Sequence, residues 1–335
     1  MTILVTGGAG FIGANYVLRR LTQSDERVVM IDALTYAGNL ESLAPVRNNS
    51  AFSFEKVDIC SADAVQAVFE ANKPDAVVHF AAESHVDRSI LGPRVFTETN
   101  VLGTQVLLDA ARTTGVKRFV MVSTDEVYGS LGATGAFTES SPLQPSSPYS
   151  ASKAAADLLA LAYNHTFGLD VVVTRCSNNY GPLQFPEKLI PLMIINALEG
   201  KKLPVYGDGM QVRDWIHVED HNAAVDAVLE KGKAGEVYNI GARNERYNID
   251  IVKHILKHLD KDESLIEYVK DRPGHDRRYA IEPAKMENEL GWKPAKDPSA
   301  AMSETIDWYI NNKEWWERVR SGAYREYYEK QYGDR

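Results

Sequence analysis

Two adjacent carboxyl groups, Asp125 and Glu126, follow the short apolar run 119–122 within the segment STDEVYG at 123–129. If that run is a strand of a parallel sheet, both groups lie at its carboxyl end, where ligands bind in open α/β sheets. Elimination of water needs two such groups, because one removes a carbon-bound proton and the other protonates the leaving hydroxyl. Adjacent like charges also raise one pKa, which leaves one carboxyl protonated. The pair therefore predicts acid–base chemistry; the alternative is an Asp-Glu turn that caps the loop.

Three glycines near the start of the chain, Gly7, Gly10 and Gly13, lie between a predicted strand and a predicted helix. Glycines there allow a tight turn, close approach of the backbone to a pyrophosphate and close helix–strand packing. Asp32, at the next strand end, is suited to accept hydrogen bonds from a ribose diol and would repel a 2′-phosphate. The pattern predicts NAD rather than NADP. Asp58 is suited to contact the edge of the adenine base. The alternative is that it is an aspartate that caps a helix or forms a turn.

Tyr149 and Lys153 are four residues apart, directly after Ser146-Ser147-Pro148, so a helix would place them on one face. A tyrosine with a pKa near 10 is a poor base at neutral pH, and lowering that pKa by about three units requires roughly 4 kcal/mol. A lysine ammonium and a positive nicotinamide ring can supply this in a low-dielectric cleft. We therefore predict hydride removal from an alcohol, with a solvated helix face as the alternative.

The elements that must position these groups are short apolar runs alternating with helical stretches. Continuous apolar character indicates strands buried on both faces, as in a parallel sheet covered by helices. The predicted strands are 3–6, 28–31, 52–54, 76–80, 119–122 and 171–174, and the predicted helices lie near 11–22, 61–71, 95–114 and 149–167. The sequence therefore predicts an α/β fold with a doubly wound parallel (Rossmann) sheet.

The second half of the chain differs, with loop-like segments and helices separated by Gly and Pro after Cys176. A chain of 335 residues is near the limit for one core, so we predict two interleaved lobes with a cleft between them. We expect a dinucleotide-binding domain over 1–177, rejoined by a strand near 237–241, and a smaller α/β substrate lobe over 178–335. An aromatic helical tail should pack on that lobe or form a subunit contact; its aromatic residues are Trp308, Tyr309, Trp315, Trp316, Tyr324, Tyr327 and Tyr328.

Composition narrows the class of protein. A formal net charge of -9 argues against nucleic acid as a partner. No apolar run reaches the roughly 20 residues needed to span a bilayer, and the first residues do not form a signal peptide. Two cysteines, Cys60 and Cys176, are too few for a disulfide framework or a zinc site, so no metal is predicted and the cytoplasm is the expected compartment.

With these residues in view, the chain resembles the extended short-chain dehydrogenase/reductase superfamily over essentially its full length. Within it, the resemblance is to the nucleotide-diphospho-sugar 4,6-dehydratases, most closely to those that act on dTDP-glucose. The motifs that carry it lie at 6–13, 34–39, 81–89, 123–129, 147–153, 178–182, 185–191 and 271–277. The first and fifth are shared with many sugar-modifying relatives, whereas the Thr-Asp-Glu triplet and the Arg-Pro-Gly-His-Asp segment are much more specific.

The resemblance implies a role for each catalytic residue, with Lys153 supporting Tyr149. Tyr149 would take the proton from the C4 hydroxyl of a glucose while the C4 hydride passes to NAD, and Thr124 would hold the C4 oxygen. Glu126 would remove the C5 proton and Asp125 would protonate the departing C6 hydroxyl. The hydride would return to C6 to give the 4-keto-6-deoxy sugar, so NAD should be tightly held and regenerated in each turnover.

The resemblance also implies the binding residues. Those for the cofactor are Gly7, Gly10, Phe11, Ile12, Gly13, Asp32, Ala33, Leu34, Thr35, Asp58, Ile59, Phe80, Ala81, Thr99, Tyr149, Lys153 and Asn179. Those for the substrate are Ser84, Thr124, Asn178, Glu187, Lys188, Leu189, Pro204, Tyr206, Arg213, Asn248, Arg272 and His275. Arg213 and Arg272 would act as forks for the diphosphate; without the resemblance, a surface salt bridge is the safer interpretation of either.

Three questions stay open at this point. The family is usually homodimeric, paired through the helices near 95–114 and 149–167, but the Ala-rich face of the second helix would also serve an ordinary core. A UDP-sugar 4-epimerase of the same fold would use NAD and Tyr149 without Asp125 or Glu126, and a non-catalytic NAD-binding redox sensor would use only the fold. The residues do not determine the nucleotide base, the downstream pathway or how the loop 129–135 covers the catalytic cleft.

Overall fold

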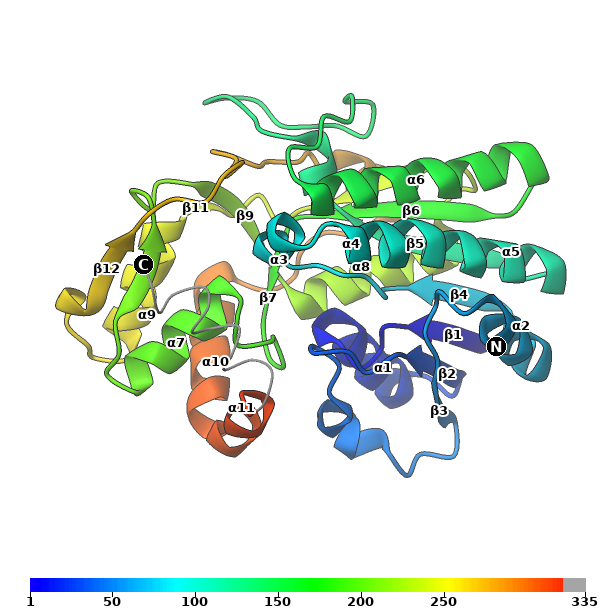
Figure 1. The fold of residues 1–335 in the computed structure, drawn as a ribbon, viewed down its shortest axis with the longest axis horizontal. Helices are drawn as coiled ribbons and strands as arrows, with labels where there is room; N and C mark the ends of the chain where they lie inside the picture. The colour runs from blue at the N-terminus through cyan, green and yellow to red at the C-terminus, as the bar shows by residue number, and fades with distance from the viewer. Residues whose placement is uncertain (322–335) are drawn as a thin grey trace.

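Seven parallel strands form the central sheet of the protein, in the order β10-β6-β5-β4-β1-β2-β3 (Figure 1). The structure is a computed structural model that describes residues 1–321. The strands are β1 (Thr2–Thr6), β2 (Arg27–Asp32), β3 (Phe52–Lys56), β4 (Ala76–His79), β5 (Arg118–Thr124), β6 (Val171–Cys176) and β10 (Val237–Ile240). This arrangement confirms the predicted doubly wound sheet, and β1 to β6 coincide with the predicted apolar runs.

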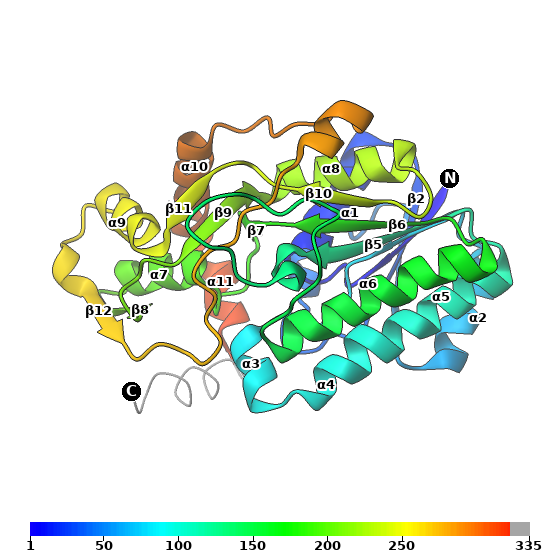
Figure 2. The ribbon, with the colours of Figure 1, turned by 90° about the horizontal axis from the view of Figure 1, so that it is seen from above.

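Helices cover both faces of this sheet (Figure 2). They include α1 (Phe11–Gln23) and α8 (Val218–Lys231) on one face, and α2 (Ala62–Asn72), α5 (Thr104–Thr114) and α6 (Pro148–Phe167) on the other. Side chains along β1 alternate between the faces, since Ile3 and Val5 belong to the core under α1 and Leu4 to the core under α5. Burial on both faces explains why most of these strands are continuously apolar, whereas β3, at the edge of the sheet, is only partly buried.

The predicted helix at 95–114 is not uniform. It consists of α4 (Arg94–Thr97), a π-helical segment at Glu98–Gly103 and α5, and it follows the short helix α3 (Val86–Leu91). The π-helical segment contains Thr99 and Asn100, and the Asn100 side chain hydrogen-bonds both Glu83 backbone groups and the Ser152 hydroxyl. Such segments often occur at functional sites.

The second lobe contains more strands than the sequence predicted. β7 (Asn178–Tyr180), β9 (Val212–His217) and β11 (Glu245–Tyr247) form one sheet, and β8 (Leu203–Tyr206) and β12 (Ile266–Val269) form another. The helices of this lobe are α7 (Leu189–Leu198), α9 (Asn248–His258), α10 (Pro298–Asn311) and α11 (Lys313–Val319). Three-residue strands such as β7 carry too little periodicity to be seen in a sequence.

The aromatic tail packs inside the second lobe as far as the structure describes it. Tyr309, Trp315 and Trp316 are buried in its core, with Trp308 partly buried against them. The Trp316 indole donates to the Tyr309 carbonyl oxygen at 2.9 Å. The other aromatic residues of the predicted tail, Tyr324, Tyr327 and Tyr328, lie outside the described residues. Within residues 1–321, no helix has the length and apolar character that crossing a membrane requires.

Candidate active site

The two adjacent carboxyl groups lie on a 3-10 turn, Asp125–Tyr128, that begins where β5 ends. Thr124 caps this turn, because its hydroxyl oxygen accepts from the Glu126 backbone N–H at 3.3 Å. The same hydroxyl donates to Asp125 Oδ1 at 3.4 Å. Asp125 is buried, whereas Glu126 is partly exposed. The turn thus separates two side chains that are neighbours in the sequence.

The surroundings of these carboxyl groups differ in charge. Burial, Glu126 and Asp214 hold the pKa of Asp125 well above its usual range. Burial also raises the pKa of Glu126, but Arg272, Arg213 and Lys188 oppose that shift. Asp125 is therefore suited to carry a proton, while Glu126 faces three cations that favour its ionised form. The pair provides an acid and a base side by side.

Helix α6 brings Tyr149 and Lys153 to the same end of the sheet. A capping box formed by Ser147 and Ser150 fixes its start, and Pro148 occupies the first helical position. The Lys153 ammonium donates to the Val122 carbonyl oxygen at 2.8 Å, which ties the helix to β5. Burial lowers the pKa of Lys153 to about 8.

Tyr149 differs from expectation in its electrostatics. Burial raises its pKa well above 10, and Glu126, Cys176 and Asp125 raise it further, while a hydrogen bond with Thr124 acts in the opposite direction. The residues around the phenol therefore do not by themselves stabilise a phenolate. A cationic group placed against the ring is required, and the positive nicotinamide ring of an oxidised dinucleotide has that charge.

The glycine-rich turn has the shape of a pyrophosphate cradle. Gly7 has φ +69°, and a Cβ there would lie 2.5 Å from the Ala81 backbone nitrogen. A Cβ on Gly13 would lie 2.3 Å from the Gly7 carbonyl oxygen, so neither position accepts a side chain. Gly10 begins α1 without a side-chain cap, which leaves the first N–H groups of the helix for an anion. These residues fit a bound dinucleotide.

Asp32 is fixed at the end of β2. Its carboxylate accepts from the Ala9 N–H at 2.9 Å and from the Leu34 N–H at 2.8 Å. Asp58 is exposed and accepts from the Cys60 N–H at 2.9 Å, so it forms the turn that was the alternative for this residue. Ile59 is buried near the Gly103 backbone.

The remaining predicted cofactor residues come from several segments. Phe11 and Ile12 start α1, Ala33, Leu34 and Thr35 follow β2, Phe80 and Ala81 follow β4, Thr99 lies in the π-helical segment and Asn179 lies in β7. The Asn179 Oδ1 atom lies 2.8 Å from the Nδ1 atom of the buried His221, which the sequence analysis did not single out.

Several predicted substrate residues lie around one cluster of cations. The Lys188 ammonium donates to the Ser84 carbonyl oxygen at 3.0 Å. Arg272 donates to Asp87 Oδ1 at 3.0 Å, and Tyr206 donates to the other oxygen of Asp87 at 3.0 Å. The ring of Tyr206 also meets His275, with centroids 6.1 Å apart. Asp87 was not predicted, although its position inside the motif 81–89 was a signal for it.

Arg213 is supported by two further residues that the sequence analysis did not identify. Its guanidinium lies over the Tyr279 ring, 4.3 Å from the centroid, and donates to the Asp276 carbonyl oxygen at 3.0 Å. Tyr279 and Ser146 both donate to the Asp276 carboxylate. The segment around Asp276 therefore connects Arg213 to the residue just before the cap of α6.

Glu187 joins the two lobes. Its carboxylate accepts from the Tyr36 hydroxyl at 2.9 Å and lies 3.4 Å from the Arg88 guanidinium. Asn178 and Asn248 are the first residues of β7 and α9, and each has a buried side-chain oxygen without a hydrogen-bond partner among the described residues. Leu189 begins α7, and Pro204 is buried inside β8.

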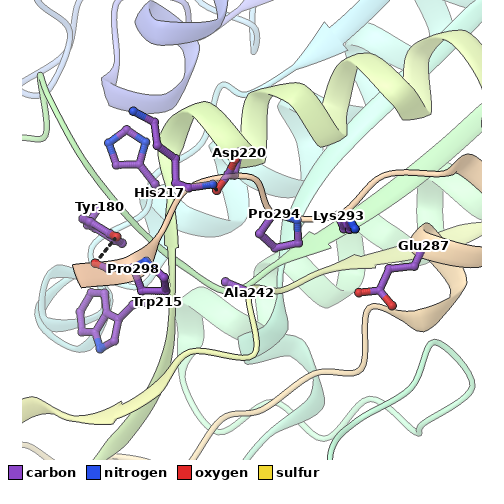
Figure 3. Close-up of a pocket in the computed structure, with 10 residues that line it drawn as sticks. Tyr180, Trp215, His217, Asp220, Ala242, Glu287, Lys293, Pro294 and Pro298 are labelled. Carbon is purple, nitrogen blue, oxygen red and sulfur yellow. Dashed lines mark hydrogen bonds between the residues drawn. The ribbon is translucent and has the colours of Figure 1, made fainter. Parts of the chain in front are cut away.

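A cavity of about 260 Å³ lies elsewhere, between β9, the start of α8 and the segment before α10 (Figure 3). It contains none of the predicted site residues. Two of its polar groups bond to nearby backbone: Tyr180 donates to the Pro298 carbonyl oxygen at 3.4 Å and Asp220 accepts from the Ala295 N–H at 3.0 Å. We therefore place the chemistry at the end of β5 and not in this cavity.

A dinucleotide cradle, a buried Tyr/Lys pair and an acid–base pair on one sheet edge define an NAD-dependent enzyme of the extended short-chain dehydrogenase/reductase fold. Comparison with known proteins agrees: the family model described as GDP-mannose 4,6 dehydratase matches residues 4–305. The chain belongs to this family.

The relatives found by the comparisons cover nearly the whole chain. A dTDP-glucose 4,6-dehydratase of Xanthomonas campestris pv. campestris (strain B100) is 54% identical, over 97% of each chain, and one of Escherichia coli is 51% identical, over 97% of this chain and 98% of its own. The crystal structure of DesIV, a dTDP-glucose 4,6-dehydratase from Streptomyces venezuelae with NAD bound, has a TM-score of 0.93 at 50% identity, covering 95% of this chain and 100% of that one. A UDP-glucose 4-epimerase from Thermotoga maritima has a TM-score of 0.87 at 29% identity, covering 93% and 100%.

Proposed function

We propose that the protein is a dTDP-glucose 4,6-dehydratase, a hydro-lyase that forms dTDP-4-keto-6-deoxyglucose for deoxysugar biosynthesis. The observation that carries this proposal is the pair Asp125 and Glu126 at one strand end: the pKa of Asp125 is held well above its usual range, whereas three cations oppose the rise at Glu126. The relatives above 50% identity, named as dTDP-glucose 4,6-dehydratases, support the same reaction.

In the proposed mechanism the residues of this chain carry out the proton transfers. Tyr149, one helical turn before Lys153 on α6, removes the proton of the C4 hydroxyl, and Thr124 holds the C4 oxygen. Once C4 is a ketone, the C5 proton is acidic enough for the Glu126 carboxylate to remove it. Asp125 donates its proton to the C6 hydroxyl, which leaves as water. As hydride is delivered to C6, Glu126 returns a proton to C5, which gives the 4-keto-6-deoxy sugar. NAD, held by the glycine-rich turn and Asp32, would supply the acceptor and donor of that hydride.

The cations of the second lobe are proposed to hold the diphosphate. Arg213 is buried and Arg272 is largely buried. The positive charges of both act on Glu126 and oppose the rise in its pKa. An anionic substrate explains why three cations gather in a chain whose formal net charge is -9. The other predicted substrate residues remain part of this proposal, as do the predicted cofactor residues.

The nucleotide and the reaction type can be tested together. Purified protein is incubated separately with dTDP-, UDP- and GDP-glucose, and the masses of the products are measured by mass spectrometry. We expect loss of one water from the dTDP sugar. In deuterated solvent a dehydratase incorporates deuterium at C5, whereas a 4-epimerase incorporates none. Unchanged mass with an inverted C4 centre would indicate an epimerase, and absence of turnover with every nucleotide sugar would indicate a non-catalytic NAD-binding protein.

We further propose that the protein is a cytoplasmic homodimer paired through α4–α5 and α6. We also propose that the boundary between its two domains lies near residue 177. Exposed apolar side chains on these helices support the pairing, among them Val95, Leu102 and Leu158. The separate core cluster of the second lobe supports the boundary. Sedimentation of the purified protein tests the dimer, and replacing Leu102 and Leu158 with glutamate should yield monomers.

A further inference from the structure

A buried ion pair lies beneath the residues to which the mechanism gives roles. Asp157 on α6 and Arg175 on β6 are 0% and 3% exposed, and Arg175 Nε lies 2.9 Å from Asp157 Oδ2. A buried ion pair generally stabilises a fold no more than well-packed apolar residues of the same volume. Its presence beside the site therefore calls for a reason other than folding.

Asp157 continues the catalytic face of α6. Tyr149, Lys153 and Asp157 are spaced at four residues, so they lie on one side of the helix. The charged and titratable groups that influence Lys153 or are influenced by it are Asp157 on the same helix, Cys176 on β6 and His79 on β4. Burial lowers the pKa of Lys153 to about 8, and Asp157 is the strongest of the opposing influences. Burial raises the pKa of Cys176 to about 12 and lowers the pKa of His79 to about 3, so both are neutral at pH 7.

Arg175 extends the pair to the turn that carries the acid and the base. Its guanidinium donates to the Tyr128 hydroxyl at 2.9 Å and lies 4.9 Å from the centroid of that ring. Tyr128 is the last residue of the 3-10 turn that begins at Asp125, and its hydroxyl donates to Asn239 Oδ1 at 2.8 Å. A chain of contacts thus runs from α6 through β6 to the catalytic turn and β10.

We infer that Asp157 and Arg175 are positioning residues for the reaction. Asp157 holds a negative charge that keeps Lys153 cationic inside the cleft, and Arg175 ties Asp157 to the turn of Asp125 and Glu126. This inference rests on the proposed function for its kinetic test, but the binding test below does not need turnover.

The first test is the pH profile of turnover for Asp157→Asn. Loss of the negative charge lowers the pKa of Lys153 further, so the lysine loses its proton at a lower pH. We expect the alkaline limb of kcat against pH to move to lower pH by about one to two units. A residue with a purely structural role would change the height of the profile and leave its limbs in place. Asp170→Asn, which breaks the partly exposed Arg118–Asp170 pair, is the matched control and should leave both limbs unchanged.

Asp157→Asn leaves Arg175 buried without its partner, which could prevent folding. The double variant D157N/R175M removes both charges and should move the alkaline limb in the same direction by a smaller amount, because loss of the Arg175 charge favours the protonated lysine. An unmoved limb in a folded, active variant of either kind overturns the charge role of Asp157.

The second test measures NAD binding, followed by tryptophan fluorescence across the same pH range. Because Lys153 is a proposed cofactor contact, the affinity of the wild-type protein should weaken as the lysine deprotonates, and in Asp157→Asn this should begin at a lower pH. If the wild-type protein does not turn over dTDP-glucose but the binding curve still moves, the proposed function fails and the inference stands. Identical binding curves for variant and wild type would refute the inference.

The third test addresses the tie to the catalytic turn. Tyr128→Phe removes the hydroxyl that accepts from Arg175 and leaves the charges of Asp157 and Lys153 intact. We expect severalfold slower elimination with an unmoved alkaline limb, so that reduced dinucleotide accumulates during turnover. Unchanged elimination in this variant would remove Arg175 from the inference.

Discussion

At the scale of single residues, Asp125 and Glu126 show how one turn gives two identical functional groups different chemistry. Thr124 holds the turn so that Asp125 is buried and Glu126 faces the cations of the second lobe. The sequence could predict that adjacent carboxyls would differ in pKa. It could not predict which would be raised more, because Asp214 and the three cations come from distant segments.

Replacing Asp125 with Asn should separate oxidation from elimination. The variant should still transfer the C4 hydride, so reduced dinucleotide accumulates, while release of the keto-deoxy sugar falls about a hundredfold or more. Stopped-flow absorbance of the reduced dinucleotide and chromatography of the product measure the two steps. Asp260→Asn, at an exposed position, is the control. Normal product release by Asp125→Asn would exclude Asp125 as the acid.

The same variant should be more stable than the wild-type protein. The pKa of Asp125 is higher in the folded than in the unfolded chain, so its stabilising contribution is complete below about pH 3.9 and is lost as the pH rises. Asparagine does not ionise, so the variant does not lose stability in this way as the pH rises. Thermal unfolding should therefore show equal stability near pH 3.5 and a gain for the variant that grows towards pH 8. A constant difference across this range would contradict the raised pKa.

Tyr149→Phe should abolish the first oxidation, because no other group is placed to take the C4 proton in the proposed mechanism. NAD should remain bound and oxidised after substrate is added, which absorbance can detect. Full hydride transfer in this variant would show that another base acts.

At the scale of elements, the start of α6 determines where the Tyr/Lys pair lies. The apolar runs predicted β1 to β6, most of which are buried on both faces and therefore leave a continuous signal; β3 is only partly buried. They did not predict the π-helical segment, whose Asn100 contacts Glu83 and Ser152, residues distant in the sequence. Nor did they predict Asp157 with Arg175 or Tyr279 beneath Arg213, because such pairs depend on how helices and loops meet the sheet.

Ser147→Ala removes the side-chain arm of the capping box of α6, in which the Ser147 hydroxyl accepts from the Ser150 N–H, and leaves the Ser147 N–H donating to the Ser150 hydroxyl. We expect a loss of about 1 kcal/mol in the free energy of unfolding, measured with urea, and a lower kcat because Tyr149 lies in the first helical turn. Ser61 occupies the same position before α2 but makes no side-chain cap bond. Ser61→Ala should therefore cost much less, and equal losses for both variants would argue against the capping box.

At the scale of the whole molecule, Tyr36, Glu187 and Arg88 connect the dinucleotide loop, the second lobe and α3. The Arg88 guanidinium lies 3.6 Å from the centroid of the Tyr36 ring, and Glu187 contacts both residues. None of these contacts could be read from the sequence, although all three residues lie in the family motifs. The network fixes how the two lobes face each other across the site.

Tyr36→Phe should loosen this connection. It leaves the buried Glu187 carboxylate with one donor fewer, which should cost about 1–3 kcal/mol of stability. We also expect a severalfold higher KM for the nucleotide sugar, because Lys188 follows Glu187 directly. Tyr268→Phe, at an exposed position, is the control. Wild-type KM and stability in Tyr36→Phe would show that the lobes are held together by other contacts.

The position of β10 at the edge of the central sheet has a consequence for synthesis of the chain. β10 pairs with β6 in register Val237↔Val173, yet the residues between the two strands include β7, β8 and β9 of the other lobe. A nascent chain that has emerged only as far as β6 exposes an unpaired strand edge, which is a template for aggregation. The dinucleotide half therefore cannot finish folding on the ribosome until β7, β8 and β9 of its partner lobe have also been made.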